Sequence, residues 1–231
     1  MTDLNDDSSS SSPAGSEVPV SSFMGSKKGE LDRLIVVSPS DGSSYLDRLY
    51  DEHGLRPPSA LGDFEDRVDE WCDAYKQGLA GSRILEIYLG NSVYLFDQGE
   101  AYERVVLAYG LSSQPKASRD QDRMRRFPDV NIGIQKHLSD AAFPADRGHF
   151  LSHASGGELD INLFPQRRDL NRGWSAEGKC FRKMEKYVAD HRGTFHYHRT
   201  VYDDDTWIPA SLEYGVLVGD ADWWVCVFAN K

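Results

Sequence analysis

One stretch of the chain, residues 146–185, holds most of the side chains that could do chemistry. His149 follows Gly148 and precedes an apolar pair, and its imidazole is a candidate general base because its unperturbed pKa lies near neutral pH. Carboxamides downstream suit a hard divalent cation or a hydrogen-bonded scaffold, and neighbouring guanidinium groups can grip phosphate bidentately. Base, oxygen ligand and phosphate clamp together predict phosphodiester hydrolysis. The further side chains are Asn162, Gln166, Asn171, Arg167, Arg168 and Arg172.

The order of these residues resembles that of a known family. Residues 146–149 read Asp-Arg-Gly-His, which is similar to the DRGH motif of the DNA/RNA non-specific endonucleases, the ββα-metal or His-Me finger enzymes of the Serratia nuclease type. Asn162 is followed four residues later by Gln166 and nine later by Asn171, which resembles the family's N-x3-Q-x4-N block. The likeness covers roughly residues 83–230. It implies an α+β fold in which an antiparallel sheet carries a ββα-metal motif.

The resemblance implies a role for each residue of the block. His149 would deprotonate the attacking water, and Asn171 would be the direct ligand of one Mg²⁺. Arg147 would neutralise charge that builds on the phosphate. The ordering residues of the site would be Asn162, Gln166 and Asp146, and the substrate-binding residues would be Arg167, Arg168 and Arg172.

A glutamate one helical stretch after the metal-binding asparagine completes the family's site, where it holds waters of the metal. Here the asparagine is followed by an apparent insertion, residues 174–179, before the helical run FRKMEKYVA. Glu185 lies in that run, whereas Glu177 falls in the insertion just before Gly178. We therefore assign the role to Glu185, with Glu177 as the alternative.

Other histidines compete for a role in the site. His153 is the main rival to His149 as base, although it lacks the arginine-glycine pair that precedes His149. His196 and His198 lie two residues apart on an expected strand, where they would share a face and could hold a metal. No third ligand lies near them in that strand, so the sequence does not favour zinc there.

Composition limits the class of protein. With 231 residues and 39% hydrophobic content, the chain can build one core. Its three cysteines are too few and too scattered for a disulfide framework, so free thiols are expected. No apolar run reaches membrane-spanning length, and the first residues lack a secretory signal. A cytoplasmic protein with no membrane contact is expected, and export by a route that needs no signal stays open.

The formal net charge of −11 is unfavourable for nucleic-acid binding, which basic surfaces usually support. Basic residues nevertheless gather near the candidate site, and residues 119–126 form a second basic run. We expect a local basic lane on an acidic body. Arg125 and Arg126 are candidates for a second phosphate contact, with a solvated charge run as the alternative reading.

The coarse organisation follows from composition and periodicity. Residues 1–30 are rich in Ser, Asp, Gly and Pro and are expected to be disordered. Residues 31–80 are expected to be a small helical region, with an apolar stripe packed on the core, and residues 81–231 the nuclease-like domain. A short strand is expected at Phe150-Leu151, with a turn at Gly156-Gly157. Further strands are expected at 84–89, 91–96, 102–109, 194–202, 207–218 and 223–228, a polar loop at 118–128, a short helix near 137–142 and a helix at 181–189.

The expected function is a Mg²⁺-dependent endonuclease, and the resemblance implies that it cleaves both DNA and RNA and leaves 5′-phosphates, with little choice of sequence or sugar. A bacterial toxin nuclease with a tight-binding immunity or inhibitor protein is one biological setting. Two alternatives remain: a catalytically inactive pseudo-nuclease that binds nucleic acid or protein, and an interaction module formed by the N-terminal helices.

Overall fold

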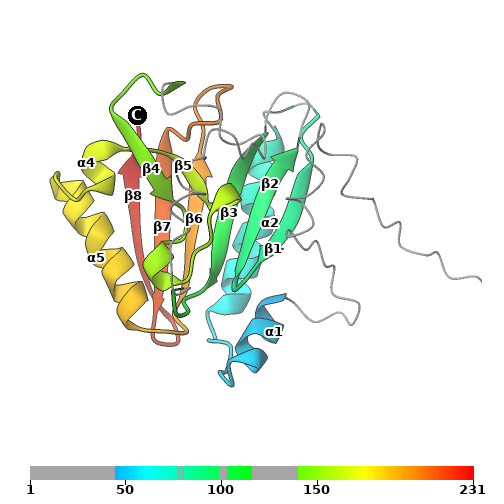
Figure 1. Ribbon diagram of the computed structural model, residues 1–231. Helices are drawn as coiled ribbons and strands as arrows, with labels where there is room; N and C mark the ends of the chain where they lie inside the picture. Colours follow the sequence, from blue (N-terminus) through cyan, green and yellow to red (C-terminus); the bar gives the residue numbers. More distant parts are fainter. Residues whose placement is uncertain (1–44, 78, 80, 99–102, 116–139) are drawn as a thin grey trace, which may run out of the picture. The chain divides into compact units, whose positions relative to one another are not determined.

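An antiparallel sheet of six strands organises the part of the chain that the structure, a computed structural model, describes: residues 45–77, 79, 81–98, 103–115 and 140–231. The sheet order is β1-β2-β3-β6-β7-β8, and β4 and β5 form a separate two-stranded antiparallel ribbon (Figure 1). The predicted α+β class with an antiparallel sheet is confirmed. The sheet strands are β1 (Ile84–Leu89), β2 (Ser92–Gln98), β3 (Glu103–Leu111), β6 (Phe195–Val201), β7 (Ser211–Val218) and β8 (Asp222–Ala229).

Several expectations lie outside the described residues. These are the disordered tail at 1–30, the basic run at 119–126 with Arg125 and Arg126, the polar loop at 118–128, and His137 with most of its expected helix.

The strands follow the apolar pattern closely where the pattern is unbroken. Gly90, with φ +60°, makes the tight turn between β1 and β2. The strand predicted from residue 207 is wrong in its first residues, because β7 begins only at Ser211. Pro209 lies in the excluded part and has no backbone N–H to contribute to a ladder.

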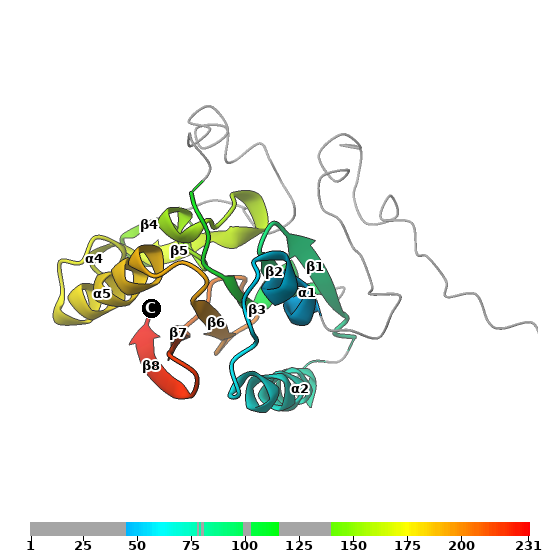
Figure 2. The same cartoon turned by 90° about the horizontal axis from the view of Figure 1, so that it is seen from below.

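One face of the sheet is covered by α2 (Leu61–Gln77), which Figure 2 shows on the side opposite to α5 and the β4–β5 ribbon. Phe64 anchors it, with its ring 4.8 Å from Phe195 and 5.2 Å from Tyr197 on β6. The predicted packing of the apolar stripe on the core is thereby confirmed. The shorter helix α1 (Tyr45–Glu52) adds Leu46, Leu49 and Tyr50 to the same core.

A buried ionic network ties α2 to the strands. The Tyr75 hydroxyl donates to Asp97 at 2.8 Å, and Arg104 Nε donates to that hydroxyl at 2.8 Å. Arg104 is only 2% exposed, and its guanidinium lies 4.0 Å from the centre of the Tyr202 ring. Since a buried cation needs partners, this network holds α2 against the sheet.

The other face of the sheet carries α5 (Ala176–Asp190), through Phe181, Met184 and Val188. The Phe181 ring lies 5.2 Å from Phe228 on β8. The helix begins earlier than predicted, because the Ser175 hydroxyl caps it by accepting from Gly178 N at 2.9 Å. Residues 176–179, expected to be an insertion, therefore form its first turn. None of the described helices combines the length and apolar character needed to cross a membrane.

Candidate functional site

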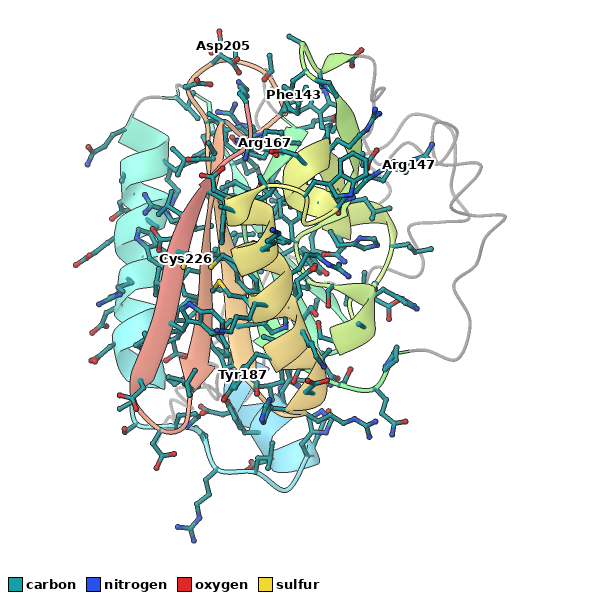
Figure 3. The ribbon with its side chains drawn as sticks, turned by 90° about the vertical axis from the view of Figure 1, so that its left-hand side faces the viewer. Phe143, Arg147, Arg167, Tyr187, Asp205 and Cys226 are labelled. Atoms are coloured by element: carbon teal, nitrogen blue, oxygen red, sulfur yellow. The ribbon has the colours of Figure 1, made fainter. Side chains whose placement is uncertain are left out.

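The ribbon of β4 (Ala145–His149) and β5 (Leu163–Arg167) positions the DRGH residues. In this register Arg147 lies opposite Pro165 and His149 opposite Leu163. Because side chains alternate along a strand, Arg147 and His149 share one face of the ribbon. Both are half-buried, and Figure 3 shows Arg147 at the level of α4 (Arg168–Asn171), the short helix that follows β5. The base candidate and its arginine therefore come from the same rigid element.

The strand predicted at Phe150-Leu151 is wrong, because the strand is the DRGH segment itself and ends at His149. Phe150 and Leu151 are buried in the loop that follows, and the Phe150 ring stacks on Phe164 of β5 at 4.4 Å. This stacking fixes the residue immediately after His149. Apolar character here reflects a buried loop rather than a strand.

Asn162 fastens the same loop. Its carboxamide nitrogen donates to the carbonyls of Leu151 and Glu158, both at 2.7 Å, and its oxygen accepts from Leu151 N at 2.8 Å. The Asn162 carbonyl also accepts from Phe150 N at 2.9 Å. Fully buried, Asn162 fixes the path of the chain as it leaves His149. The turn predicted at Gly156-Gly157 is part of this loop, with Gly156 at φ +92°.

The close approach of the Gln166 side chain explains why the third residue of the DRGH motif is a glycine. A Cβ atom added to Gly148 would come 2.5 Å from the Gln166 Cβ and would clash with the Gln166 amide oxygen. Gln166 is fully buried, and neither polar atom of its amide has a hydrogen-bond partner among the described residues. Gly148 thus allows the two strands to enclose a buried amide.

Asp146 pairs with two of the arginines expected to bind substrate. Arg168 Nε donates to it at 3.0 Å, and Arg172 donates through both Nε and Nη2. Burial raises the pKa of the Asp146 carboxyl, but the hydrogen bonds and charges of Arg172 and Arg168 outweigh it and hold the pKa below its usual range. Arg168 and Arg172 remain 43% and 47% exposed. Asp146 therefore orders these two arginines, each of which keeps solvent-facing surface.

The third arginine, Arg167, precedes the short helix that follows β5 and pairs with two other carboxylates. Its guanidinium donates to Asp169 at 2.7 Å and to Glu177 in the first turn of α5. Its backbone N donates to the Asn230 side chain at 2.9 Å. Asn230, fully buried near the chain's end, also donates to the carbonyl of Pro165. Nothing in its sequence context separates Asn230 from an ordinary polar residue, so its role in holding β5 was missed.

Asn171, the metal-ligand candidate, ends the short helix α4 (Arg168–Asn171), which the sequence analysis did not predict. The helix follows β5 without a loop and packs against both strands of the ribbon. Asn171 is half-buried, and within the described part of the chain its side chain makes no hydrogen bond. Gly173, at φ +70°, then turns the chain into α5.

The two glutamates lie in different surroundings. Glu177 is exposed and paired with Arg167, whereas Glu185 is only 13% exposed and accepts from Arg182 at 2.7 Å. Burial first, and the charge of Glu185 second, raise the pKa of Tyr214 on β7. Glu185 therefore faces the sheet side of α5, while Glu177 stabilises the start of that helix.

The rival histidines lie apart from the ribbon. His153 lies in the short 3-10 turn η4 (His153–Ser155), which packs against α5. His196 and His198 are buried on the sheet, and His198 stacks on Tyr214 at 3.9 Å. Burial lowers the pKa of His196 to about 3. Burial and the charge of His196 lower the pKa of His198. Among the described residues, no three or more His, Cys, Asp or Glu side chains group to hold a metal.

Comparison of the chain with models of known protein families found no match, and comparison with curated proteins found none either.

Proposed function

We propose that the chain is a Mg²⁺-dependent endonuclease that hydrolyses DNA and RNA without choosing between their sugars. The observation that carries the proposal is the position of three side chains. Arg147 and His149 share a face of the ribbon, and Asn171 ends the helix into which the ribbon leads. In this proposal β4, β5 and the two helices that follow them form the ββα-metal motif.

The proposed reaction assigns the proton transfer to His149. One ring nitrogen of His149 takes the proton of the attacking water, while Arg147 donates hydrogen bonds to the non-bridging phosphate oxygens. The base must keep its position to within a fraction of an ångström. The loop fastened by Asn162 and the Phe150–Phe164 stack supply that rigidity directly after His149.

The donor set fits magnesium by its chemistry. Mg²⁺ prefers oxygen ligands and needs only one or two from the protein. Asn171 offers a half-buried carboxamide without a hydrogen bond among the described residues, and Glu185 offers a shielded carboxylate. When bound, the ion would neutralise charge on the phosphoryl oxygens. Both glutamates pair with an arginine, and Glu177 is the weaker candidate because its side chain is 47% exposed against 13% for Glu185.

A second candidate function is a pseudo-nuclease that binds nucleic acid or protein without cutting. One observation favours it: Arg167, Arg168 and Arg172 all pair with carboxylates of the chain itself, which weakens the expected phosphate clamp. If the chain is instead an active toxin nuclease, we expect an immunity or inhibitor protein to bind it. The N-terminal interaction module finds less support, because the apolar face of α2 packs on the sheet.

The test is degradation of supercoiled plasmid and of RNA by the purified protein, with Mg²⁺ or with EDTA. His149→Ala should lower the rate by at least about a hundredfold if a general base is lost. His153→Ala is the matched control, since it removes the rival imidazole outside the ribbon. Asn171→Ala should raise the Mg²⁺ concentration needed for half-maximal rate.

The outcomes separate the candidates. Cleavage that needs metal and His149 but not His153 supports the enzyme. A well-folded protein that binds RNA or plasmid but cuts neither contradicts it and favours the pseudo-nuclease. Loss of activity in His153→Ala alone would move the base to η4.

A further inference from the structure

The solvent face of α5 is basic although the chain as a whole carries a formal charge of −11. Residues around an α-helix are spaced by about 100°. On this spacing the exposed bases of α5 fall within an arc of about 100°, opposite Phe181, Met184 and Val188, which pack on the sheet. The bases on this face are Lys179, Arg182, Lys183 and Lys186. One acid, Asp190, falls on the same face and pairs with Lys186 at 2.7 Å, so bases outnumber acids by four to one.

Aromatic rings flank this basic face. Trp174, immediately before the helix cap, is 63% exposed, and the guanidinium of Arg172 lies 4.9 Å from its ring centre. At the other end Lys183 Nζ lies 5.7 Å from the Trp224 ring on β8, which in turn contacts Tyr187 at 6.3 Å. Figure 3 views this side and shows Tyr187 near the end of α5. A cation therefore lies beside an aromatic ring at each end of this face.

We propose that this face, from Trp174 along α5 to Trp224, binds single-stranded nucleic acid and feeds it to the candidate active site. The substrate would thus be single-stranded DNA or RNA in preference to duplex. This rests on the proposed nuclease function. The exposed Trp174 ring can stack on an unpaired base, whereas the bases of a duplex already stack on one another. Lys179 and Lys183 are one helical turn apart, about 6 Å, so these two cations reach more than one phosphate.

Two ion pairs join this face to the site. Arg182, at the edge of the basic face and 60% exposed, donates to Glu185, which turns toward the sheet. Arg172, under the Trp174 ring, pairs with Asp146 of the DRGH segment. A strand bound along α5 would therefore pass beside both flanks of the candidate site.

The test measures binding without cleavage. Fluorescence anisotropy in EDTA would compare a labelled single-stranded oligonucleotide with a hairpin duplex of matched length, using the whole chain. Trp174→Ala should weaken single-strand binding on the order of tenfold or more, with a smaller loss for Trp174→Phe and little change for the duplex. Lys179→Gln with Lys183→Gln should reduce the slope of log K against log salt by about 1.4. Lys76→Gln, an exposed lysine on α2, is the control.

Each outcome decides the proposal. Equal single-strand affinity of Trp174→Ala and the unmodified chain would overturn it. A competition experiment gives a second such outcome. If polyglutamate of matched charge displaced the labelled oligonucleotide at the same concentration as unlabelled oligonucleotide does, the partner would be an acidic protein and the proposal would be overturned. Binding that depends on Trp174, in a protein that cuts nothing with Mg²⁺, would support the single-strand surface while contradicting the nuclease.

Discussion

The Sγ atoms of Cys180 on α5 and Cys226 on β8 lie 3.9 Å apart. Both thiols are half-buried, and Figure 3 shows Cys226 facing α5. The sequence-based expectation of free thiols is confirmed. Burial and the neighbouring Cys180 raise the pKa of the Cys226 thiol, so this thiol is protonated and slow to react at neutral pH.

We therefore predict that a small disulfide oxidant such as oxidised glutathione will join Cys180 to Cys226 at alkaline pH, with release of two reduced glutathione molecules. The bond would close a loop between residues 46 positions apart and stabilise the fold by roughly 2–4 kcal/mol. Mass spectrometry of peptides and thermal unfolding would check both points. The control variant Cys72→Ser should form the same disulfide as the unmodified chain. A disulfide of the unmodified chain that contains Cys72 would contradict the prediction.

A second prediction concerns the close approach of Gly148 and Gln166. Gly148→Ala should lower the free energy of unfolding by about 1–3 kcal/mol, because the new methyl group displaces the buried Gln166 side chain. Gly62→Ala is the matched control, since a Cβ there meets nothing within 4 Å. In a helix that change should stabilise by up to about 1 kcal/mol. Urea unfolding would measure the stability of both variants. A Gly148→Ala variant as stable as the Gly62→Ala variant would refute the steric account.

A third prediction concerns Asn162. Asn162→Asp places an oxygen where the amide donated to the carbonyls of Leu151 and Glu158. A buried carbonyl that loses its donor costs about 1–3 kcal/mol, so the variant should lose several kcal/mol of stability. Amide hydrogen exchange should rise first in residues 150–158, before the sheet. Unchanged protection of that loop would show that Asn162 does not hold it.

Much of the fold follows from patterns that are local. The stripe that begins at Phe64 has helical spacing, and the run from Val93 to Phe96 is apolar because that strand is buried on both faces. Residues 145–149 carry no such pattern, because the ribbon lies outside the main sheet. The sequence therefore predicts the strand at the apolar pair Phe150-Leu151, directly after the residues that form it.

The ion pairs of the candidate site are not readable from spacing. Asp146 meets its arginines across 22 and 26 positions, and Asn230 reaches Arg167 across 63. Sequence analysis could name arginines that grip an anion, but it could not tell phosphate from a carboxylate of the same chain. Motif order thus named Asp146, Arg168 and Arg172 as residues of one site, while the ion pairs among them required the folded structure.

The last prediction concerns the two buried histidines of β6. Burial holds the pKa of His196 at about 3 and that of His198 well below its usual value, whereas both regain a pKa of about 6.5 on unfolding. Below about pH 6.5 the unfolded chain therefore binds protons that the folded chain does not. The free energy of unfolding should rise with pH and be lost as pH falls from about 6.5 toward 3, by up to about 1.4 kcal/mol per pH unit for each histidine.

His198→Phe should flatten this dependence, because phenylalanine keeps the ring contacts with Tyr214 and Phe181 and cannot bind a proton. Urea unfolding at intervals between pH 7 and pH 5 would measure the slope, above the range where most carboxylates titrate. His191→Gln, at the exposed end of α5, should keep the slope of the unmodified chain. A His198→Phe variant with the full slope would mean that His198 gains access to solvent in the folded protein.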